Sequence, residues 1–119
     1  MSTTPTRPAG ANHRRPLSAT EVVTRLSKLS GWRLCGDGAD LAIEKSYAFP
    51  GYAETLAFAN AVAYQAQADD HHPVLTVQHR LCGVRYSTHE PKGLSSADFD
   101  SAARVDALFE SAYPAAAHG

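Results

Sequence analysis

The sequence predicts an α+β fold in which three helices pack on one face of a four-stranded antiparallel sheet, in the order α-β-β-α-β-β-α. Three segments space their apolar residues at helical intervals, and the segments between them alternate apolar with polar residues. Such alternation indicates strands with one buried and one wet face, which is typical of an antiparallel sheet covered on one side. A chain of 119 residues is long enough to bury one core, and the sequence contains no internal repeat.

The folded domain is expected to span residues 17–113. Residues 1–16 contain three prolines, three arginines and almost nothing that could be buried, which favours a disordered N-terminal arm. Residues 114–119 are expected to form a frayed tail.

The first helix is predicted over residues 18–30. Ser18 and Glu21 have the spacing of a capping box, and Leu17 before them is placed to act as a hydrophobic staple. Gly31 supplies the C-terminal stop.

Two strands are predicted before the second helix. The first begins at Trp32, and Gly36-Asp37-Gly38 indicates a tight turn into the second. The apolar residues of the second strand share one face and its polar residues share the other; the first set is Leu41, Ile43, Tyr47 and Phe49, and the second is Asp40, Glu44 and Ser46.

A long alanine-rich helix is predicted over residues 52–70, because alanine has the highest intrinsic helix propensity and lets a helix lie close to a sheet. Near its end, Tyr64 and Gln67 are expected to approach the region of the following histidines. The residues expected to face the sheet are Tyr52, Leu56, Ala59, Ala63 and Ala66, with Phe58 and Val62 beside them.

The C-terminal part of the chain is expected to return to the sheet and end in a helix. The predicted elements are strands at 74–78 and 81–88, a loop at 90–93 and a helix at 95–113. Ser95 and Asp98 form a weaker version of the capping box. The expected apolar stripe of this helix is Phe99, Ala102, Ala103 and Phe109.

The strongest functional signal is Asp69-Asp70-His71-His72-Pro73, where two carboxylates meet two imidazoles at the predicted end of the long helix. Imidazole titrates near neutral pH, and a helix C-terminus favours its protonated form. Pro73 ends the helix, so the imidazoles should point in different directions, one into a pocket and one to its rim. His89 falls at a strand end beside the same rim. The pattern predicts general acid–base catalysis.

Other chemistries fit the sequence less well. Adjacent histidines chelate poorly and neither Cys35 nor Cys82 is near them, so no metal site is expected. The sequence lacks the G-x-S-x-G elbow of hydrolases. The two cysteines have no C-x-x-C spacing, so we expect reduced, mostly buried thiols.

Net charge and hydropathy limit the kinds of molecule that the protein is expected to bind. A formal net charge of −1 argues against non-specific nucleic-acid binding, which needs a clustered basic face. There is no apolar run of about 18 residues to span a membrane and no apolar secretory segment at the N-terminus, so a cytoplasmic protein is expected.

The chain resembles the pterin-4a-carbinolamine dehydratase family over about residues 17–110. The likeness is carried by Leu-Ser-x-x-Glu in the first helix, Gly31-Trp32, Asp70-His71-His72-Pro73, Ser87-Thr88-His89, Lys92-Gly93-Leu94, Asp98 and Ala102-Ala103-Arg104-Val105-Asp106. It implies the family fold, with subunits that pair through sheet edges into homodimers and often homotetramers.

The resemblance also implies an activity: dehydration of 4a-hydroxytetrahydropterin to quinonoid dihydropterin, which recycles the pterin cofactor of aromatic amino acid hydroxylases and itself needs no cofactor. It assigns His71 and His89 to proton transfer, and His72 to catalysis and to holding the pterin. It leaves open which imidazole is the acid and which the base. The further substrate-binding candidates are Asp70, Gln67 and Thr88.

Two positions depart from the family pattern. Gln67 stands where an acidic residue is usual, and His79 stands where an aromatic residue is usual. They keep a second function open, that of a non-catalytic member with a protein client. Such members include a Rubisco assembly factor of α-carboxysomes and, in animals, a dimerisation cofactor of a transcription factor.

Overall fold

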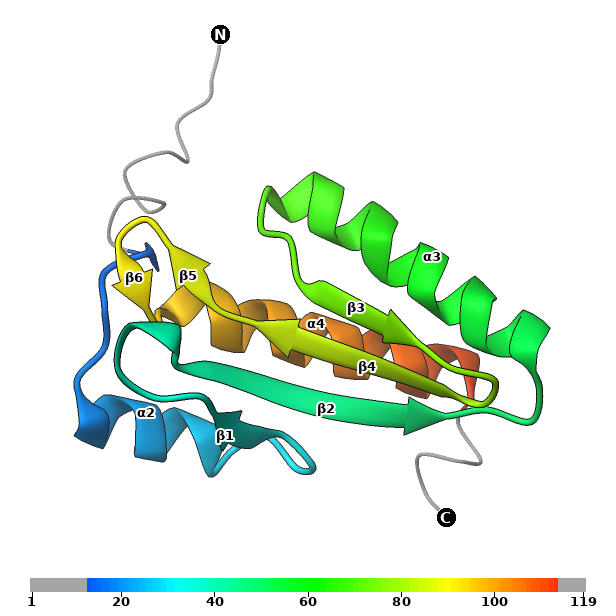
Figure 1. Cartoon of the computed structure of the whole chain (residues 1–119), viewed down its shortest axis with the longest axis horizontal. Coiled ribbons are helices and arrows are strands. Elements are labelled where there is room, and N and C mark those ends of the chain that lie inside the picture. Colours follow the sequence, from blue (N-terminus) through cyan, green and yellow to red (C-terminus); the bar gives the residue numbers. More distant parts are fainter. Residues whose placement is uncertain (1–12, 114–119) are drawn as a thin grey trace, which may run out of the picture.

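A computed structural model describes residues 13–113 and confirms the predicted α+β fold (Figure 1). The four main strands form one antiparallel sheet in the order β1-β2-β4-β3, so β1 and β3 are its edges. The helices are α2 (Ala19–Leu26), α3 (Tyr52–Asp69) and α4 (Ser96–Ala112), and the strands of the main sheet are β1 (Arg33–Cys35), β2 (Ala42–Ala48), β3 (Val74–Val77) and β4 (Leu81–Tyr86).

The first helix begins as predicted but ends early. Ser18 caps α2 in a full capping box, in which its Oγ accepts from the Glu21 N–H (3.2 Å) and its own N–H donates to Glu21 Oε1 (2.8 Å). Helix geometry stops at Leu26 rather than residue 30, because the next backbone bonds span three residues (Lys28 N–H to Arg25, Leu29 N–H to Leu26) and tighten the chain into turns.

The turn between β1 and β2 contains a short 3-10 helix, η1 (Gly38–Asp40). Gly36 before it has φ +72°, and a Cβ there would lie 2.3 Å from the Asp40 carbonyl oxygen, so this turn requires glycine. The predicted alternation of β2 is confirmed: Ile43 and Tyr47 are buried, whereas Ser46 is exposed.

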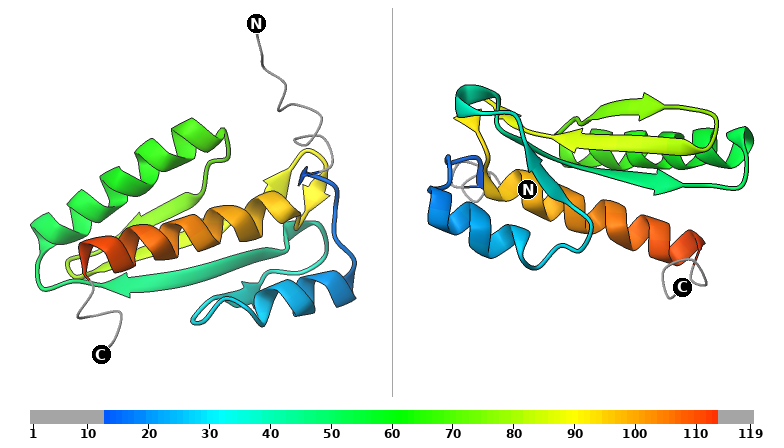
Figure 2. Two further views of the ribbon diagram at one scale, coloured as in Figure 1. Left: turned by 180° about the vertical axis from the view of Figure 1, so that it is seen from behind. Right: turned by 60° about the horizontal axis from the view of Figure 1, so that its bottom comes forward.

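The sheet buries the face that the helices cover. Pairing of Ile43 with Tyr86 and of Tyr47 with Cys82 puts these side chains on the same face, in one core with Phe58 of α3. Figure 2 shows α4 lying along the sheet on the side away from the view of Figure 1. The opposite face carries Glu44, Ser46, Arg85 and their neighbours.

The buried face of α3 differs from the one predicted. Phe58, Val62, Ala59, Ala66 and Thr55 are buried, whereas Tyr52, Leu56 and Ala63, which were expected to face the sheet, are exposed. The reason is that aromatic and β-branched side chains fill the core better than alanine, so the helix is rotated toward Phe58 and Val62.

The segment after β4 also differs from the prediction. In place of a loop at 90–93, a hairpin forms in which β5 (Thr88–His89) pairs with β6 (Lys92–Gly93). It is separate from the main sheet and extends toward the N-terminal segment (Figure 1).

The last helix, α4, has the predicted start and end but a slightly different buried face. Ala102 and Phe99 are buried as expected, whereas Ala103 is exposed and Phe109 half-buried. Val105 and the small residues Ala97 and Ser101 complete the buried side. Small residues allow close approach of α4 to the sheet, which the apolar pattern alone did not indicate.

Asp106 links α4 to the sheet through three donors. Its carboxylate accepts hydrogen bonds from the Tyr47 hydroxyl (2.5 Å), the Lys45 ammonium (2.8 Å) and the Trp32 indole N–H (3.1 Å). Burial, and next the bond to Asp106, raise the pKa of the Tyr47 hydroxyl far above its ordinary value.

The N-terminal arm is shorter than expected where the structure describes it. Residues 13–16 were assigned to the disordered arm, but they contact the folded domain through His13, Arg14 and Pro16. The predicted arm at 1–12 and the tail at 114–119 lie outside the described residues. None of the helices between residues 13 and 113 combines the length and apolar content that crossing a bilayer requires.

Candidate active site

The C-terminal end of α3 directs the two adjacent histidines differently. Asp70 adopts a left-handed conformation (φ 53°), and the His71 N–H donates to the Ala66 carbonyl (3.1 Å), a bond of the Schellman type that closes the helix. The chain therefore reverses just before the pair. His71 is buried, with 6% of its surface exposed, whereas His72 is exposed, as the sequence predicted for one pocket and one rim histidine.

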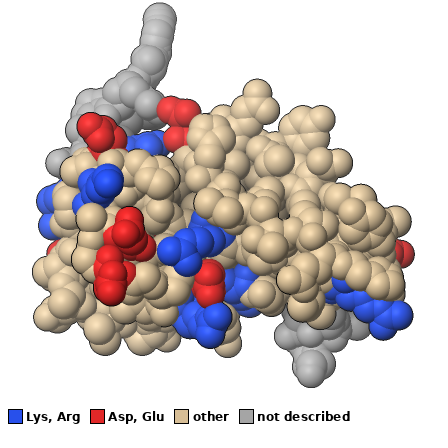
Figure 3. All heavy atoms as spheres, in the orientation of Figure 1, with Lys and Arg blue, Asp and Glu red and all other residues tan. Residues whose placement is uncertain are grey.

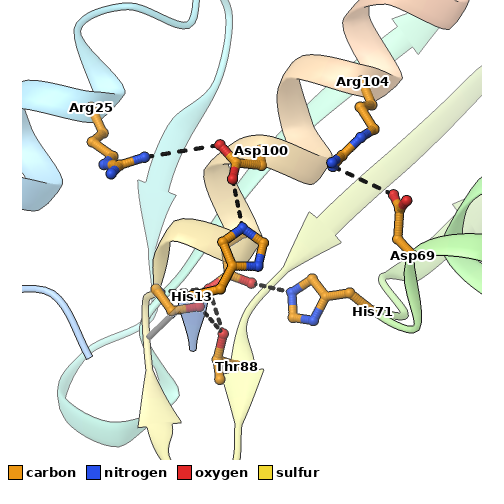
Figure 4. A network of polar contacts seen from close by, with 9 residues as sticks. His13, Arg25, Asp69, His71, Thr88, Asp100 and Arg104 are labelled. Atoms are coloured by element: carbon orange, nitrogen blue, oxygen red, sulfur yellow. Dashed lines mark hydrogen bonds and ion pairs between the residues drawn. The ribbon is translucent and has the colours of Figure 1, made fainter. Parts of the chain in front are cut away.

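Behind His71 lies a buried carboxylate, Asp98, at the start of α4. His71 Nε2 is 2.6 Å from Asp98 Oδ1, and Asp98 is fully buried. The second oxygen, Oδ2, accepts from the Thr88 hydroxyl (2.8 Å) and the Ser95 N–H (2.9 Å). Figure 4 shows His71 and Thr88 beside the start of α4.

This hydrogen-bond network determines which nitrogen of the His71 ring faces Asp98 and which one is left for a ligand. The Thr88 and Ser95 hydroxyls lie 2.6 Å apart, so both oxygens of Asp98 and these two hydroxyls have hydrogen-bond partners. A carboxylate held in this way accepts a hydrogen bond from the Nε2–H, which leaves Nδ1 as the ring nitrogen that can exchange a proton with a ligand. The arrangement orients the imidazole.

Tyr86 of β4 supports the His71 ring from one face. The two rings are nearly parallel (8°) with centroids 5.6 Å apart. Burial raises the pKa of the Tyr86 hydroxyl above its ordinary value, so this side chain stays neutral beside the imidazole. Packing and hydrogen bonding together restrict the His71 ring to one orientation.

A cavity of about 150 Å³ opens in front of His71. Three predicted site residues besides His71 line it: His72, His89 and Asp70. The structure therefore brings all three histidines to one place, although His72 and His89 are 17 positions apart in sequence. The remaining lining residues are Arg14, Ser87 and Glu90.

Two other predicted substrate-binding residues lie elsewhere. Gln67 is exposed on α3 and is not part of the cavity lining, and Tyr64, which was expected near it, is 76% exposed. Thr88 is buried, and its hydroxyl bonds Ser95 and Asp98 rather than facing the cavity. Its position supports the imidazole indirectly.

His79 lies far from the cavity in the fold. It occupies the turn between β3 and β4, where its ring packs edge-on against the ring of Tyr52 at the start of α3, with the ring centroids 6.5 Å apart. The histidines of the cavity follow the opposite end of α3. The departure from the family pattern at His79 therefore does not alter the cavity.

Sequence reasoning missed three residues of this site. Asp98 was interpreted as a helix cap, which it is, since it accepts from the Ser95 N–H, but a cap motif does not indicate a second partner. Arg14 was placed in the disordered arm, and Tyr86 was not singled out. For Arg14 and Tyr86 no sequence signal was available, because their roles depend on contacts across the fold.

Metal-binding groups and reactive thiols are the other types of site that the sequence raised. No three His, Cys, Asp or Glu side chains within residues 13–113 gather closely enough to hold a metal ion. Cys82 is buried and Cys35 half-buried, both are free, and burial raises the pKa of both thiols.

Comparison with known proteins gives one family throughout. The family model of pterin 4 alpha carbinolamine dehydratase matches residues 15–108. A protein of Paracidovorax citrulli, provisionally named pterin-4-alpha-carbinolamine dehydratase, is 57% identical over 98 residues, covering 82% of this chain and 84% of its own. A protein of Nitrosospira multiformis with the same provisional name is 42% identical over 95 residues, covering 80% of each chain.

Two solved structures are similar. A transcriptional coactivator/pterin dehydratase from Brucella melitensis superposes with a TM-score of 0.73 at 26% identity, covering 79% of this chain and 98% of that one. A pterin dehydratase-like protein described as a RuBisCO assembly factor in the α-carboxysome gives a TM-score of 0.56 at 29% identity, covering 66% and 88%.

Proposed function

The chain belongs to the pterin 4 alpha carbinolamine dehydratase family, and from this premise we propose that it dehydrates 4a-hydroxytetrahydropterin to quinonoid dihydropterin. The observation that carries the proposal is the convergence of His71, His72 and His89 on one cavity, with His71 held by the buried Asp98. The physiological role that follows is recycling of the pterin cofactor of an aromatic amino acid hydroxylase.

The reaction needs one proton donor and one acceptor. The substrate loses the N5 proton and its 4a-hydroxyl leaves as water, which forms the C4a–N5 double bond. Of the two proposed proton-transfer groups, His71 is rigid and buried, and His89 is exposed on the β5–β6 hairpin. One removes the N5 proton and the other protonates the leaving hydroxyl, while His72 holds the ring.

The size of the cavity limits how the substrate sits. Pockets that enclose small ligands have volumes of about 300–1,000 Å³, whereas this cavity has about 150 Å³. The reacting edge of the flat ring therefore enters against His71, and the rest of the ring lies over the rim. The rim supplies Asp70 and His72 for binding.

The positions of Gln67 and His79, the two departures from the family pattern, are compatible with catalysis. Neither Gln67 nor His79 lines the cavity, so their replacement leaves the histidines and their support in place. Acid–base chemistry depends on the imidazoles more than on a neighbouring carboxylate.

Substitution of the histidines tests the proposal. We expect His89→Ala to lower kcat at least tenfold with little loss of stability, because a general acid or base typically contributes about 10²- to 10⁴-fold and this side chain is exposed. His71→Ala should lower kcat as strongly. It should also cost about 1–3 kcal/mol of stability, because it leaves the Oδ1 atom of the buried Asp98 without its partner.

The measurement is dehydratase turnover per folded molecule in a hydroxylase-coupled assay, with thermal denaturation alongside. His79→Ala is the matched control, since this histidine is exposed and remote from the cavity, and its turnover should be unchanged. Wild-type turnover in folded His71→Ala and His89→Ala proteins would show that the histidines do not carry the reaction.

A second candidate is a non-catalytic, protein-binding role. It is favoured by an exposed stripe on α3, where Tyr52, Leu56 and Tyr64 are 53%, 41% and 76% exposed. Large exposed apolar and aromatic groups in one row mark contact surfaces. If the protein shows neither dehydratase turnover nor binding of a reduced pterin at millimolar concentration, the enzyme proposal fails. The protein-binding role, with a client such as Rubisco, then takes its place.

We also propose that the stripe and the open edge β3 serve self-association. Figure 3 shows that the face over α3 and β3 carries few charged side chains. Sheet continuation at β3 would give a homodimer, and packing of the α3 stripes would double it into a homotetramer.

A further inference from the structure

The N-terminal segment that precedes α2 is anchored on both sides of Arg14. On one side, His13 Nε2 is 2.5 Å from Asp100 Oδ2 on α4, and Figure 4 shows Arg25 approaching the same carboxylate. On the other side, the Leu17 N–H donates to the Leu94 carbonyl (2.8 Å). Two anchors four residues apart hold the intervening chain against the domain.

Between these anchors, Arg14 reaches the candidate active site. Its guanidinium donates to the Asp70 carbonyl oxygen (2.7 Å), and it lines the cavity together with the histidines. The position is electrostatically favourable, because the C-terminus of α3 carries a partial negative charge. A guanidinium has five N–H donors in a planar fork, so one bond to Asp70 leaves donors for a ligand.

Arg14 supplies a property that the other rim residues lack. Asp70 and Glu90 at the rim are acceptors, suited to the ring N–H and amino groups of a pterin. The pterin ring also has a carbonyl oxygen, which accepts a hydrogen bond, and a donor that carries a permanent charge makes the stronger bond to it. Arginine stays charged at any pH at which proteins fold, unlike the histidines.

We propose that Arg14 is a substrate-positioning residue, which donates a hydrogen bond to the carbonyl oxygen of the pterin ring at the rim of the cavity. The inference rests on the proposed function and extends it, because it assigns to the N-terminal segment a part in substrate recognition. Arg14 does not transfer a proton, so it affects binding and orientation rather than the chemical step.

The adjacent Arg15 provides a matched control. It has the same charge and is one residue away, but its guanidinium pairs with Glu21 on α2 (3.0 Å) and does not line the cavity. If removal of any positive charge near the N-terminus weakens pterin binding, the affinity should fall in both Arg14→Ala and Arg15→Ala. If the contact in the cavity is responsible, the affinity should fall in Arg14→Ala alone.

The first experiment measures binding of 7,8-dihydrobiopterin by calorimetry and steady-state dehydratase kinetics. We expect Arg14→Ala to weaken binding and raise KM about tenfold, the scale of one charge-assisted hydrogen bond, with kcat within about twofold of wild type. Arg14→Lys should recover part of the affinity, and Arg15→Ala should match wild type. Thermal denaturation should be nearly unchanged, because the hydrogen bond from Arg14 to the Asp70 carbonyl is exposed to solvent.

The second experiment tests the carbonyl contact itself with a 2,4-diaminopteridine, in which an amino group replaces the ring carbonyl. Arg14→Ala should bind this compound as well as wild type does, because the amino group offers no acceptor to the guanidinium. Equal losses for both ligands would overturn the carbonyl assignment, and equal binding of dihydrobiopterin by wild type and Arg14→Ala would overturn the role of Arg14. If wild type itself neither binds nor turns over a pterin, the proposed function fails, a result distinct from either.

Discussion

At the scale of single residues, the site depends on one carboxylate that does two tasks. Asp98 accepts from the Ser95 N–H as a helix cap, and it also orients His71 through a short contact. The first task belongs to the N-terminus of α4 and would be met by many sequences. The second requires that α4 start directly behind the C-terminal end of α3, so it is a property of the packing.

We predict that Asp98→Asn lowers kcat about 10- to 100-fold, the usual cost of removing a group that orients an active-site histidine. The amide fills the same volume but cannot balance a charge on His71.

Asp100→Asn is the control for the Asp98 variant, because Asp100 lies two residues along α4 and contacts His13 and Arg25 instead of His71. Its kcat should match that of wild type. An Asp98→Asn enzyme with reduced stability but a wild-type kcat would indicate a purely structural carboxylate.

At the scale of the elements, α4 is joined to the sheet by both apolar packing and the Asp106 cluster. Three donors, two from β2 and one from Trp32 just before β1, meet one half-buried carboxylate. Because Asp106 is one of few polar groups on the inner side of α4, it fixes the rotation of the helix as well as adding stability. The rotation in turn places Asp98, two turns earlier, behind His71.

We predict that Asp106→Ala lowers the free energy of unfolding by about 2–4 kcal/mol, because Lys45, Tyr47 and Trp32 lose a shared partner in a poorly hydrated site. Asp100→Ala, whose carboxylate is 45% exposed, should cost about 1 kcal/mol or less. The measurement is chemical denaturation at pH 7. Similar losses in both variants would show that the cluster adds little.

The effect of Asp106→Ala should also depend on alkaline pH. Burial and Asp106 raise the folded-state pKa of Tyr47, so the proton is held more tightly in the folded protein. The contribution of the Tyr47 proton to the free energy of unfolding is therefore complete below the unfolded-state pKa of about 10. It is lost as pH rises above that value. The difference between wild type and Asp106→Ala should be constant from pH 6 to 10, because burial alone keeps the folded-state pKa of Tyr47 raised in the variant, and should shrink only once the pH exceeds that raised value.

At the scale of the whole molecule, the monomer exposes two features that favour self-association. The edge strand β3 leaves backbone N–H and C=O groups of the sheet unpaired, and Val74 on it is 60% exposed. The α3 stripe lies next to this edge in sequence and in the fold (Figure 1). Neither Val74 nor the residues of the α3 stripe line the cavity, so association and catalysis can coexist.

We predict a homodimer or homotetramer in multi-angle light scattering. Val74→Lys should weaken the dimer, because a charge beside an edge strand opposes sheet continuation. Tyr64→Glu should convert a tetramer to a dimer. Val23→Lys is the control, since Val23 is 65% exposed on α2, away from both features, and it should leave the mass unchanged. A monomer at every concentration would refute the assembly.

The sequence by itself determined the element order, the capped start of α2, the alternation of β2 and the identity of the three histidines. These follow from local chemistry: a side chain that caps its own helix, or a period that matches one buried face, depends on near neighbours in the chain. The separation of His71 and His72 into a buried and an exposed side chain was local in the same sense, because Pro73 and the helix end decide it.

Only the tertiary structure decided which partner each of these residues has. Asp98 rather than Asp69 or Asp70 contacts His71, because α4 packs behind the end of α3. The rotation of α3 follows from filling a shared core, and so the sequence pattern misassigned its buried face. Arg14 joins the cavity because anchors on α4 and beside the β5–β6 hairpin hold its segment in place. Contacts between residues far apart in the chain depend on the geometry of the whole domain, and local patterns do not record that geometry.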